Sequence, residues 1–158
     1  HCPRSNLKLG SGLCPTQRLL EREINVALGT DGAASNNRLN MLGELQLATL
    51  IGKIAHSDTK AVDAWTALEM ATINGARALG QDAMLGTIEV GKAADLIALD
   101  LSGVHHMPRH DLASSLVYAS DGNEVTWSWI AGQAMVRNGQ LQPLDSSDLT
   151  SRASHWCA

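Results

Sequence analysis

The sequence LGTDGAASNN, residues 28–37, places a single carboxylate in a small polar loop directly after a short apolar run. The run Asn25–Gly29 predicts a buried strand, and Asp31 follows its end. A carboxylate in that position can ligate a divalent metal, and it can accept a proton from an attacking water. It can equally cap the following turn through its own side chain. The residues alone leave both roles of Asp31 open.

Polar side chains also gather in HCPRSNLKLGSG, residues 1–12. His1, Ser5 and Asn6 stand close enough in sequence to suit a binding loop, whereas a surface loop with a solvated His1 is the simpler alternative. Cys2 beside His1 does not indicate a nucleophile pair, because adjacent side chains of an extended chain point to opposite faces.

Two other groups of residues favour structural roles. In HHMPRH, His105 and His106 are expected to diverge in an extended chain, and Pro108 interrupts the spacing to His110, so we predict a structural loop rather than a metal site. Trp127 and Trp129 share one strand face at a period of two residues, which favours packing over a platform for stacking bases.

Two helices are expected before Gly80. Apolar residues recur on one face between about Asn40 and His56, at Met41, Leu45, Ala48 and Ile51 or Gly52. A second helix is predicted from Asp63 as its N-cap to about Leu79, with Gly80 as C-cap. Its inner face would hold Ala64, Leu68, Ala71 and Leu79.

Beyond Gly80 the pattern favours strands. Ile88 and Val90 suggest a short strand, and Asp95–Leu101 has the length and composition of another. Residues Glu124–Arg137 predict two paired strands with a turn at Gly132. The polar segment Asp145–Ala158 is expected to form a short helix or a frayed tail.

Composition narrows the classes of protein. Twelve Lys and Arg against 16 Asp and Glu give a net charge of −4, which argues against nucleic acid or a membrane surface as a partner. No apolar run approaches the roughly 20 residues of a membrane span. Three cysteines at unmatched spacings indicate neither a disulfide framework nor a CxxC metal site, and they favour a cytoplasmic setting. The chain starts with HCPRSN, without Met or a signal pattern, so we expect a piece of a longer protein.

Four motifs in order, HCPRSNLKLGSG, LGTDGAASNN, TALEMATINGARALG and GTIEVGKAADLIALD, resemble the C-terminal part of the metal-dependent amidohydrolase superfamily. The resemblance covers His1 to about Gly139 and is nearest to the branch of methylthioadenosine and S-adenosylhomocysteine deaminases and chlorohydrolase-type enzymes. It implies an α/β fold, in which a (β/α)8 TIM barrel adjoins a small β-sandwich. Residues 1–80 would be the C-terminal part of the barrel, residues 81–143 part of the sandwich, and residues 144–158 a C-terminal helix or tail.

The resemblance also implies roles for residues. Asp31 would be the metal ligand of the eighth barrel strand and would shuttle protons, which makes it the catalytic residue. His1, Ser5 and Asn6 match the motif after the seventh strand, which lines the substrate pocket. The remaining metal-binding histidines and the catalytic His and Glu would lie upstream of His1. The chain is therefore expected to be inactive alone and to need the remainder of its own chain.

The implied activity is hydrolytic deamination of an amino-substituted heteroaromatic ring, with methylthioadenosine or S-adenosylhomocysteine as substrate. One divalent metal is expected, zinc in first place and iron as the alternative, together with a homo-oligomeric state. Triazine dechlorination and deamination of guanine or cytosine are the alternatives within the superfamily. A non-catalytic scaffold paralogue is the alternative from another class, and the absence of an upstream His-x-His pair would favour it.

Overall fold

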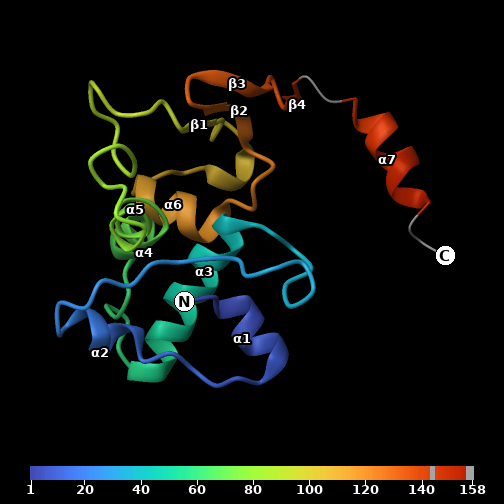
Figure 1. Cartoon of the computed structure of the whole chain (residues 1–158). Helices are drawn as coiled ribbons and strands as arrows, with labels where there is room; N and C mark the ends of the chain where they lie inside the picture. The colour runs from blue at the N-terminus through green and yellow to red at the C-terminus, as the bar shows by residue number, and fades with distance from the viewer. Residues whose placement is uncertain (143–144, 156–158) are drawn as a thin grey trace. The chain divides into compact units, whose positions relative to one another are not determined.

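The computed structural model describes residues 1–142 and 145–155, which form two compact units (Figure 1). The first unit comprises residues 1–92 and 102–122, and the second comprises residues 93–101 together with the described residues from 123 onward. Within the described ranges, no helix has the length and apolar character needed to cross a membrane. The predicted boundary between residues 143 and 144 lies outside the described residues, and the three predicted domain ranges stay predictions.

The first unit is helical. Its apolar core has two clusters, one built on Leu45, Ala64, Ala67, Ala113 and Val117 and the other on Val26, Val62 and Met70. The elements, in chain order, are α1 (Pro3–Leu9), α2 (Thr16–Leu20), α3 (Met41–His56), α4 (Ala64–Ala71), α5 (Ile73–Ala78), the short 3-10 helix η1 (Val104–His106) and α6 (Leu112–Ala119).

The helix predicted from Asn40 to His56 is confirmed as α3. The Asn40 side chain accepts hydrogen bonds from the backbone N–H groups of Leu42 and Gly43, which is the geometry of an N-cap. Leu45, Ala48 and Gly52 lie on the buried face, as the spacing predicts. The buried face also includes a charged residue, Glu44, that the apolar pattern does not reveal.

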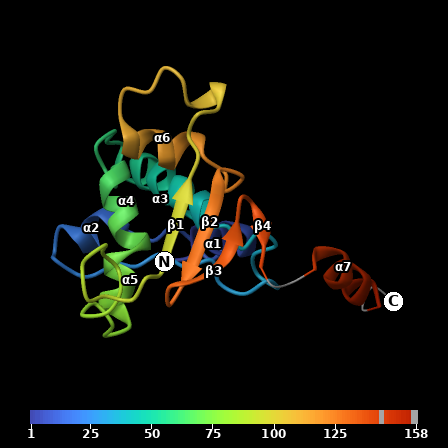
Figure 2. The same cartoon turned by 90° about the horizontal axis from the view of Figure 1, so that it is seen from above.

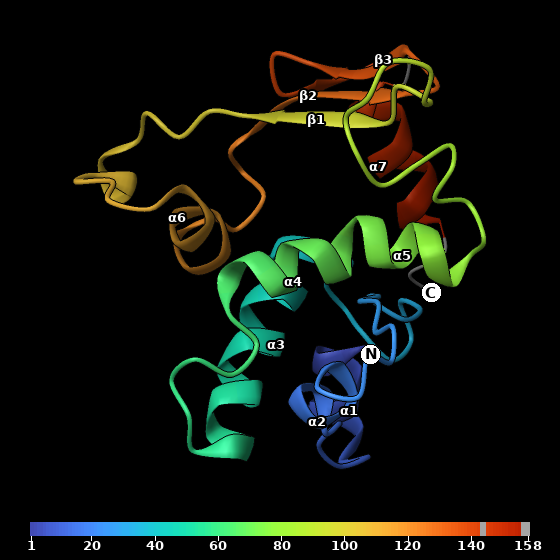
Figure 3. The same cartoon turned by 90° about the vertical axis from the view of Figure 1, so that its left-hand side faces the viewer.

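The helix predicted from Asp63 to Leu79 is two helices, α4 and α5, which follow each other along the chain (Figure 3). The break between them is at Thr72. The predicted N-cap, Asp63, is confirmed, whereas the C-cap of α5 is Leu79 and the predicted Gly80 is the residue after it. Asp63 accepts from the Thr66 N–H at 2.8 Å, and Gly80 adopts a left-handed φ of 64° just past α5. The inner-face assignment of Leu79 is wrong, since this residue follows the break and is 75% exposed.

Two predicted strands do not form. Residues 25–29 make one parallel pairing step with His1, whose backbone N donates to Ala27 O at 2.8 Å while Gly29 N donates to His1 O at 3.0 Å. A buried parallel strand needs neighbours on both edges, and this pairing supplies a single step on one edge. Ile88 and Val90 are likewise exposed in a turn, because no strand of the described chain pairs with them.

A matched pair of glycines tests the packing of α3. A Cβ at Gly52 would meet Val62 Cγ2 at 2.6 Å, whereas a Cβ at Gly75 of α5 meets nothing within 4 Å. Val62 is buried and is held at a φ of 44°, so it cannot move aside easily. Gly52→Ala should therefore destabilise by about 1–3 kcal/mol through overpacking. Gly75→Ala should stabilise by about 0.5–1 kcal/mol through helix propensity. Unfolding midpoints of the protein expressed from its complete gene measure both, and a rise for Gly52→Ala would contradict the packing.

The second unit is built on an antiparallel sheet with strand order β1-β2-β3-β4 (Figure 2). The strands predicted within 95–101 and 124–137 are confirmed. Of the short helix or frayed tail predicted for Asp145–Ala158, the described residues form a helix. The bounds are β1 (Leu96–Leu99), β2 (Val125–Ile130), β3 (Gln133–Arg137), β4 (Gln140–Leu141) and α7 (Ser146–Ser154).

The turn between β2 and β3 explains their pairing. Ala131 and Gly132 both have positive φ, at 49° and 77°, which is the two-residue turn that suits the twist of a hairpin. Ala131 N also donates to Asp95 Oδ1 at 2.6 Å, which ties the turn to the segment before β1. On β2 the rings of Trp127 and Trp129 stack with centroids 5.5 Å apart, and the Arg137 guanidinium lies over Trp127. The two tryptophan rings thus pack against each other and against Arg137 on one face of the sheet.

Candidate active site

The Asp31 carboxylate is the centre of a compact hydrogen-bond cluster in the first unit. Its Oδ2 accepts from the Ser5 hydroxyl at 2.7 Å and from the Ser35 hydroxyl at 2.5 Å. Its Oδ1 accepts from the backbone N–H of Gly32 at 2.7 Å. Asp31 itself has a φ of 60°, a left-handed conformation that is uncommon outside glycine and that aspartate tolerates better than most residues. The loop therefore fixes the direction of this side chain.

These donors favour the charged form of the Asp31 carboxylate. The hydroxyl of Ser35, then that of Ser5, then the Gly32 N–H lower the pKa of Asp31 from 3.8 to about 2, because hydrogen bonds to the charged form favour it. Asp31 is thus an anionic carboxylate at neutral pH. An ionised aspartate oxygen is a normal zinc ligand, so the chemistry of this side chain fits a divalent metal.

Helix α1 brings Ser5 to Asp31 across 26 residues of sequence. Lys8, one turn further along α1, donates to Asn37 Oδ1 at 2.7 Å and to Ala34 O at 3.2 Å. The side chains of Ser5 and Lys8 in the HCPRSNLKLGSG motif therefore bind the LGTDGAASNN loop directly. The resemblance places the two motifs after neighbouring barrel strands, and the structure adds the side-chain hydrogen bonds that join them.

The other two predicted pocket residues lie nearby on the same segment. His1 pairs with residues 27–29 through its backbone, and its Nδ1 is buried without a hydrogen bond among the residues that the structure describes. Asn6 follows Ser5 on α1, and its backbone bonds with Cys2 and Ser11. The substrate-binding roles of His1, Ser5 and Asn6, and the metal and catalytic roles of Asp31, stay predictions.

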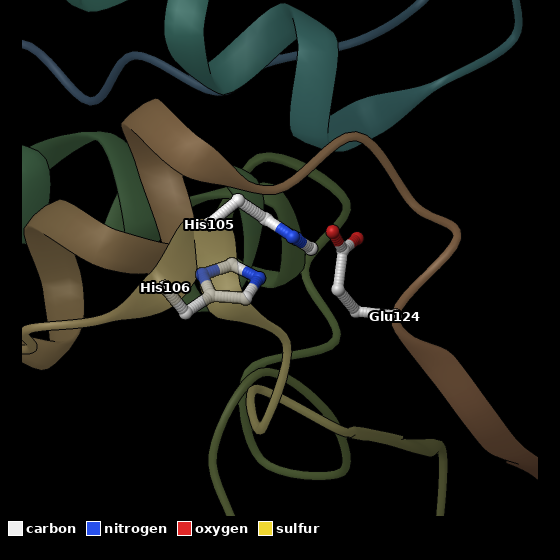
Figure 4. Close-up of side chains that lie close together, drawn as sticks. All are labelled: His105, His106 and Glu124. Atoms are coloured by element: carbon white, nitrogen blue, oxygen red, sulfur yellow. The ribbon is translucent and has the colours of Figure 1, made fainter.

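The histidine-rich segment differs from its expectation in one respect. His105 and His106 belong to the tight turn of η1, not to an extended chain, so their rings do not diverge but lie with centroids 4.2 Å apart (Figure 4). His106 Nδ1 lies 2.9 Å from the Ser115 hydroxyl of α6. Glu124, also drawn in Figure 4, belongs to the second unit.

Sequence reasoning missed two residues near Asp31. Asn36 and Glu44 are both fully buried, and the Asn36 amide donates to Glu44 Oε1 at 2.8 Å and to Thr30 O at 2.8 Å. The signal that could have found them is an acidic residue on the inward face of a helix, beside Leu45. A buried acid requires partners, so it points to a polar network.

Known proteins resemble this chain over nearly its whole length. The 5-methylthioadenosine/S-adenosylhomocysteine deaminase of Teredinibacter turnerae is 49% identical over 156 residues, which is 99% of this chain and 35% of that protein. The enzyme of the same name from Haloarcula marismortui is 47% identical over 158 residues, which is 100% of this chain and 36% of that protein. The chain thus spans about a third of the length of the curated relatives that it matches.

Solved structures agree. An adenosine deaminase from Xanthomonas campestris with bound zinc superimposes with a TM-score of 0.97 at 45% identity, covering 99% of this chain and 36% of that one. An atrazine chlorohydrolase from Arthrobacter aurescens complexed with zinc gives 0.91 at 33% identity, covering 100% and 35%. The sequence profile of the amidohydrolase family matches residues 1–135, and the chain belongs to that family.

Proposed function

We propose that the protein containing this chain is a zinc-dependent aminohydrolase that deaminates the adenine ring of methylthioadenosine or S-adenosylhomocysteine. The observation that carries the proposal is the ionised Asp31 carboxylate, held by the hydroxyls of Ser5 and Ser35. The curated relatives at 44–49% identity are named 5-methylthioadenosine/S-adenosylhomocysteine deaminase. In this reaction water adds to the ring carbon that bears the amino group, the carbon–nitrogen bond breaks, and ammonia leaves.

Within this scheme Asp31 holds zinc, together with ligands from outside this chain. Zinc, when bound, would supply the Lewis acidity that makes water a nucleophile at neutral pH. Asp31 would accept the proton that water releases and return it to the departing amine. His1, Ser5 and Asn6 would border the substrate.

The hydrogen bonds of Asp31 limit which oxygen can act. A carboxylate offers about four lone-pair sites, two on each oxygen. The Ser5 and Ser35 hydroxyls occupy Oδ2, and the Gly32 N–H occupies one site of Oδ1. Among the residues that the structure describes, the other site on Oδ1 accepts no hydrogen bond, and Asp31 would hold zinc without losing these hydrogen bonds. The Ser35 hydroxyl also lies 3.1 Å from Gly32 O, so its proton can turn to that carbonyl and free Oδ2 for the transferred proton.

The same proposal assigns the architecture and setting. Residues 1–80 would supply the C-terminal strands and helices of a (β/α)8 barrel, and residues 81–143 would contribute to a β-sandwich. The single pairing step between His1 and residues 27–29 is the parallel hydrogen-bond pattern that adjacent barrel strands require. We further propose that the protein is cytoplasmic and homo-oligomeric and that the metal ligands missing here lie upstream of His1.

Ammonia release by the product of the complete gene tests the proposal. We expect release from methylthioadenosine and S-adenosylhomocysteine, its loss after treatment with a chelator, and its recovery on adding zinc. The second candidate activity, triazine dechlorination, is favoured by the fit to the atrazine chlorohydrolase and would appear as chloride release from atrazine. Guanine and cytosine complete the substrate panel. A zinc-free protein that acts on none of these compounds would instead be the scaffold paralogue.

A further inference from the structure

Glu44 is a charged residue buried outside the cluster around Asp31. It lies in the first turn of α3, and no part of its side chain is exposed. Removing a carboxylate from water costs several kcal/mol in order of magnitude unless partners replace the lost hydration. The partners of Glu44 therefore indicate what this residue does.

Those partners come from two separate segments. Glu44 Oε2 accepts the backbone N–H of Arg4 at 3.0 Å, in the first turn of α1. Helix α1 has no side-chain cap of its own, so Glu44 satisfies one of its free N–H groups. Glu44 Oε1 accepts from the Asn36 amide at 2.8 Å and lies 3.5 Å from Arg4 Nε. One carboxylate thus joins the start of α1 to the end of the Asp31 loop.

Each segment also carries one hydroxyl donor of Asp31. Ser5 directly follows Arg4, and Ser35 directly precedes Asn36. The Asn36 amide also donates to Thr30 O at 2.8 Å, next to Asp31 itself. A shift of Glu44 would therefore move both hydroxyls that converge on Asp31 Oδ2.

We infer that Glu44 is a positioning residue for the Asp31 carboxylate, acting through Arg4 and Asn36 to fix the Ser5 and Ser35 hydroxyls. The inference rests on the proposed role of Asp31 as zinc ligand and proton carrier. In this scheme Glu44 contacts neither the zinc nor the substrate. It acts by fixing the direction of the Asp31 oxygens.

The first test compares Glu44→Gln with Glu69→Gln in the product of the complete gene. Gln keeps the shape of Glu44 but has one acceptor oxygen for two N–H donors. Glu69 is exposed on α4 and undergoes the same chemical change. We expect Glu44→Gln to weaken zinc binding, measured by chelator competition, by about tenfold or more, as loss of outer-sphere support typically does. Its kcat should fall while KM changes little, and Glu69→Gln should match the parent in all three.

A second variant covers the case in which Glu44→Gln does not fold. Asn36→Ala removes the link from Glu44 to the loop, together with the hydrogen bonds of Asn36 to Thr30 O and the Arg38 N–H. It should weaken zinc binding in the same direction. Where both single variants fold, the double variant should lose less zinc affinity than the sum of the two, because the residues act through one connection. Additive losses would overturn the inference.

The outcomes separate the inference from the proposed function. Parent protein that binds zinc but releases no ammonia defeats the proposed function, and the zinc measurements still judge Glu44. A folded Glu44→Gln protein with parental zinc affinity and kcat, whatever its unfolding midpoint, defeats the inference alone. A parent protein that binds no zinc overturns both.

Discussion

Replacing Asp31 by Asn in the product of the complete gene is expected to lower kcat for deamination by about 100- to 10,000-fold, the usual contribution of a positioned proton-transfer group. The amide lacks the negative charge that holds zinc and cannot take up a proton at neutral pH. It still offers an oxygen to the Gly32 N–H and a nitrogen to the Ser5 and Ser35 hydroxyls, which can act as acceptors. The fold should therefore persist, with a nearly unchanged unfolding midpoint.

Asp82→Asn is the matched control for that substitution, since Asp82 is an exposed aspartate of the same unit. Its kcat and zinc content should equal those of the parent. An Asp31→Asn enzyme that deaminates at the parental rate would refute the proton-carrier role. Parental turnover together with parental zinc content would remove Asp31 from the metal centre as well.

The second large effect is expected from Met70→Ala, by about 2–5 kcal/mol of lost stability. Met70 has no exposed surface and forms a core cluster with Val26 and Val62. Truncation leaves a cavity in the core cluster against which Leu28 packs, in the segment that leads to Asp31. Unfolding of the full gene product by urea would measure the loss. Met84→Ala, at a residue 49% exposed, is the control and should cost far less; equal losses would contradict the burial.

The sequence was most informative where a local rule decides the structure. Asp63 caps α4 as predicted, because its short polar side chain reaches a free N–H group of the first turn. Asn40, predicted only as the approximate start of a helix, caps α3 in the same way. It was least informative where a partner decides. Residues 25–29 and the Ile88–Val90 segment have strand composition, yet a strand exists only with a hydrogen-bonded neighbour, and composition does not say whether one is present.

Helix α6 shows a different limit. Asp111 caps it, and Ala113 and Val117 repeat at helical spacing on its buried face, so a signal was present. The helix has eight residues and lies between segments of strand composition, which masked that signal. The break at Thr72 explains the wrong assignment of Leu79. The helical spacing that places Ala64, Leu68 and Ala71 on one face does not continue beyond the break, so it does not predict which side Leu79 faces.

For the candidate site, the motif around Asp31 identified the carboxylate but not what holds it. The hydroxyl of Ser5 and the amide of Asn36 act across the fold, at separations of 26 and 8 residues from their acceptors. Such contacts depend on the packing of α1 against α3. The spacing of residues within one motif does not predict how two separate helices pack.

The strand order of the second unit has a consequence for how the chain folds. β2 and β3 are joined by two residues, but the connection from Leu99 to Val125 passes through residues 102–122 of the first unit. The entropic cost of closing a loop rises slowly with its length, by about 0.6 kcal/mol for each doubling. Pairing of β1 with β2 therefore has a larger entropic cost than pairing of β3 with β2. Ordering residues 102–122 shortens the free part of that connection. Formation of the helical unit and pairing of β1 with β2 therefore favour each other, and the two units share part of their folding cooperativity.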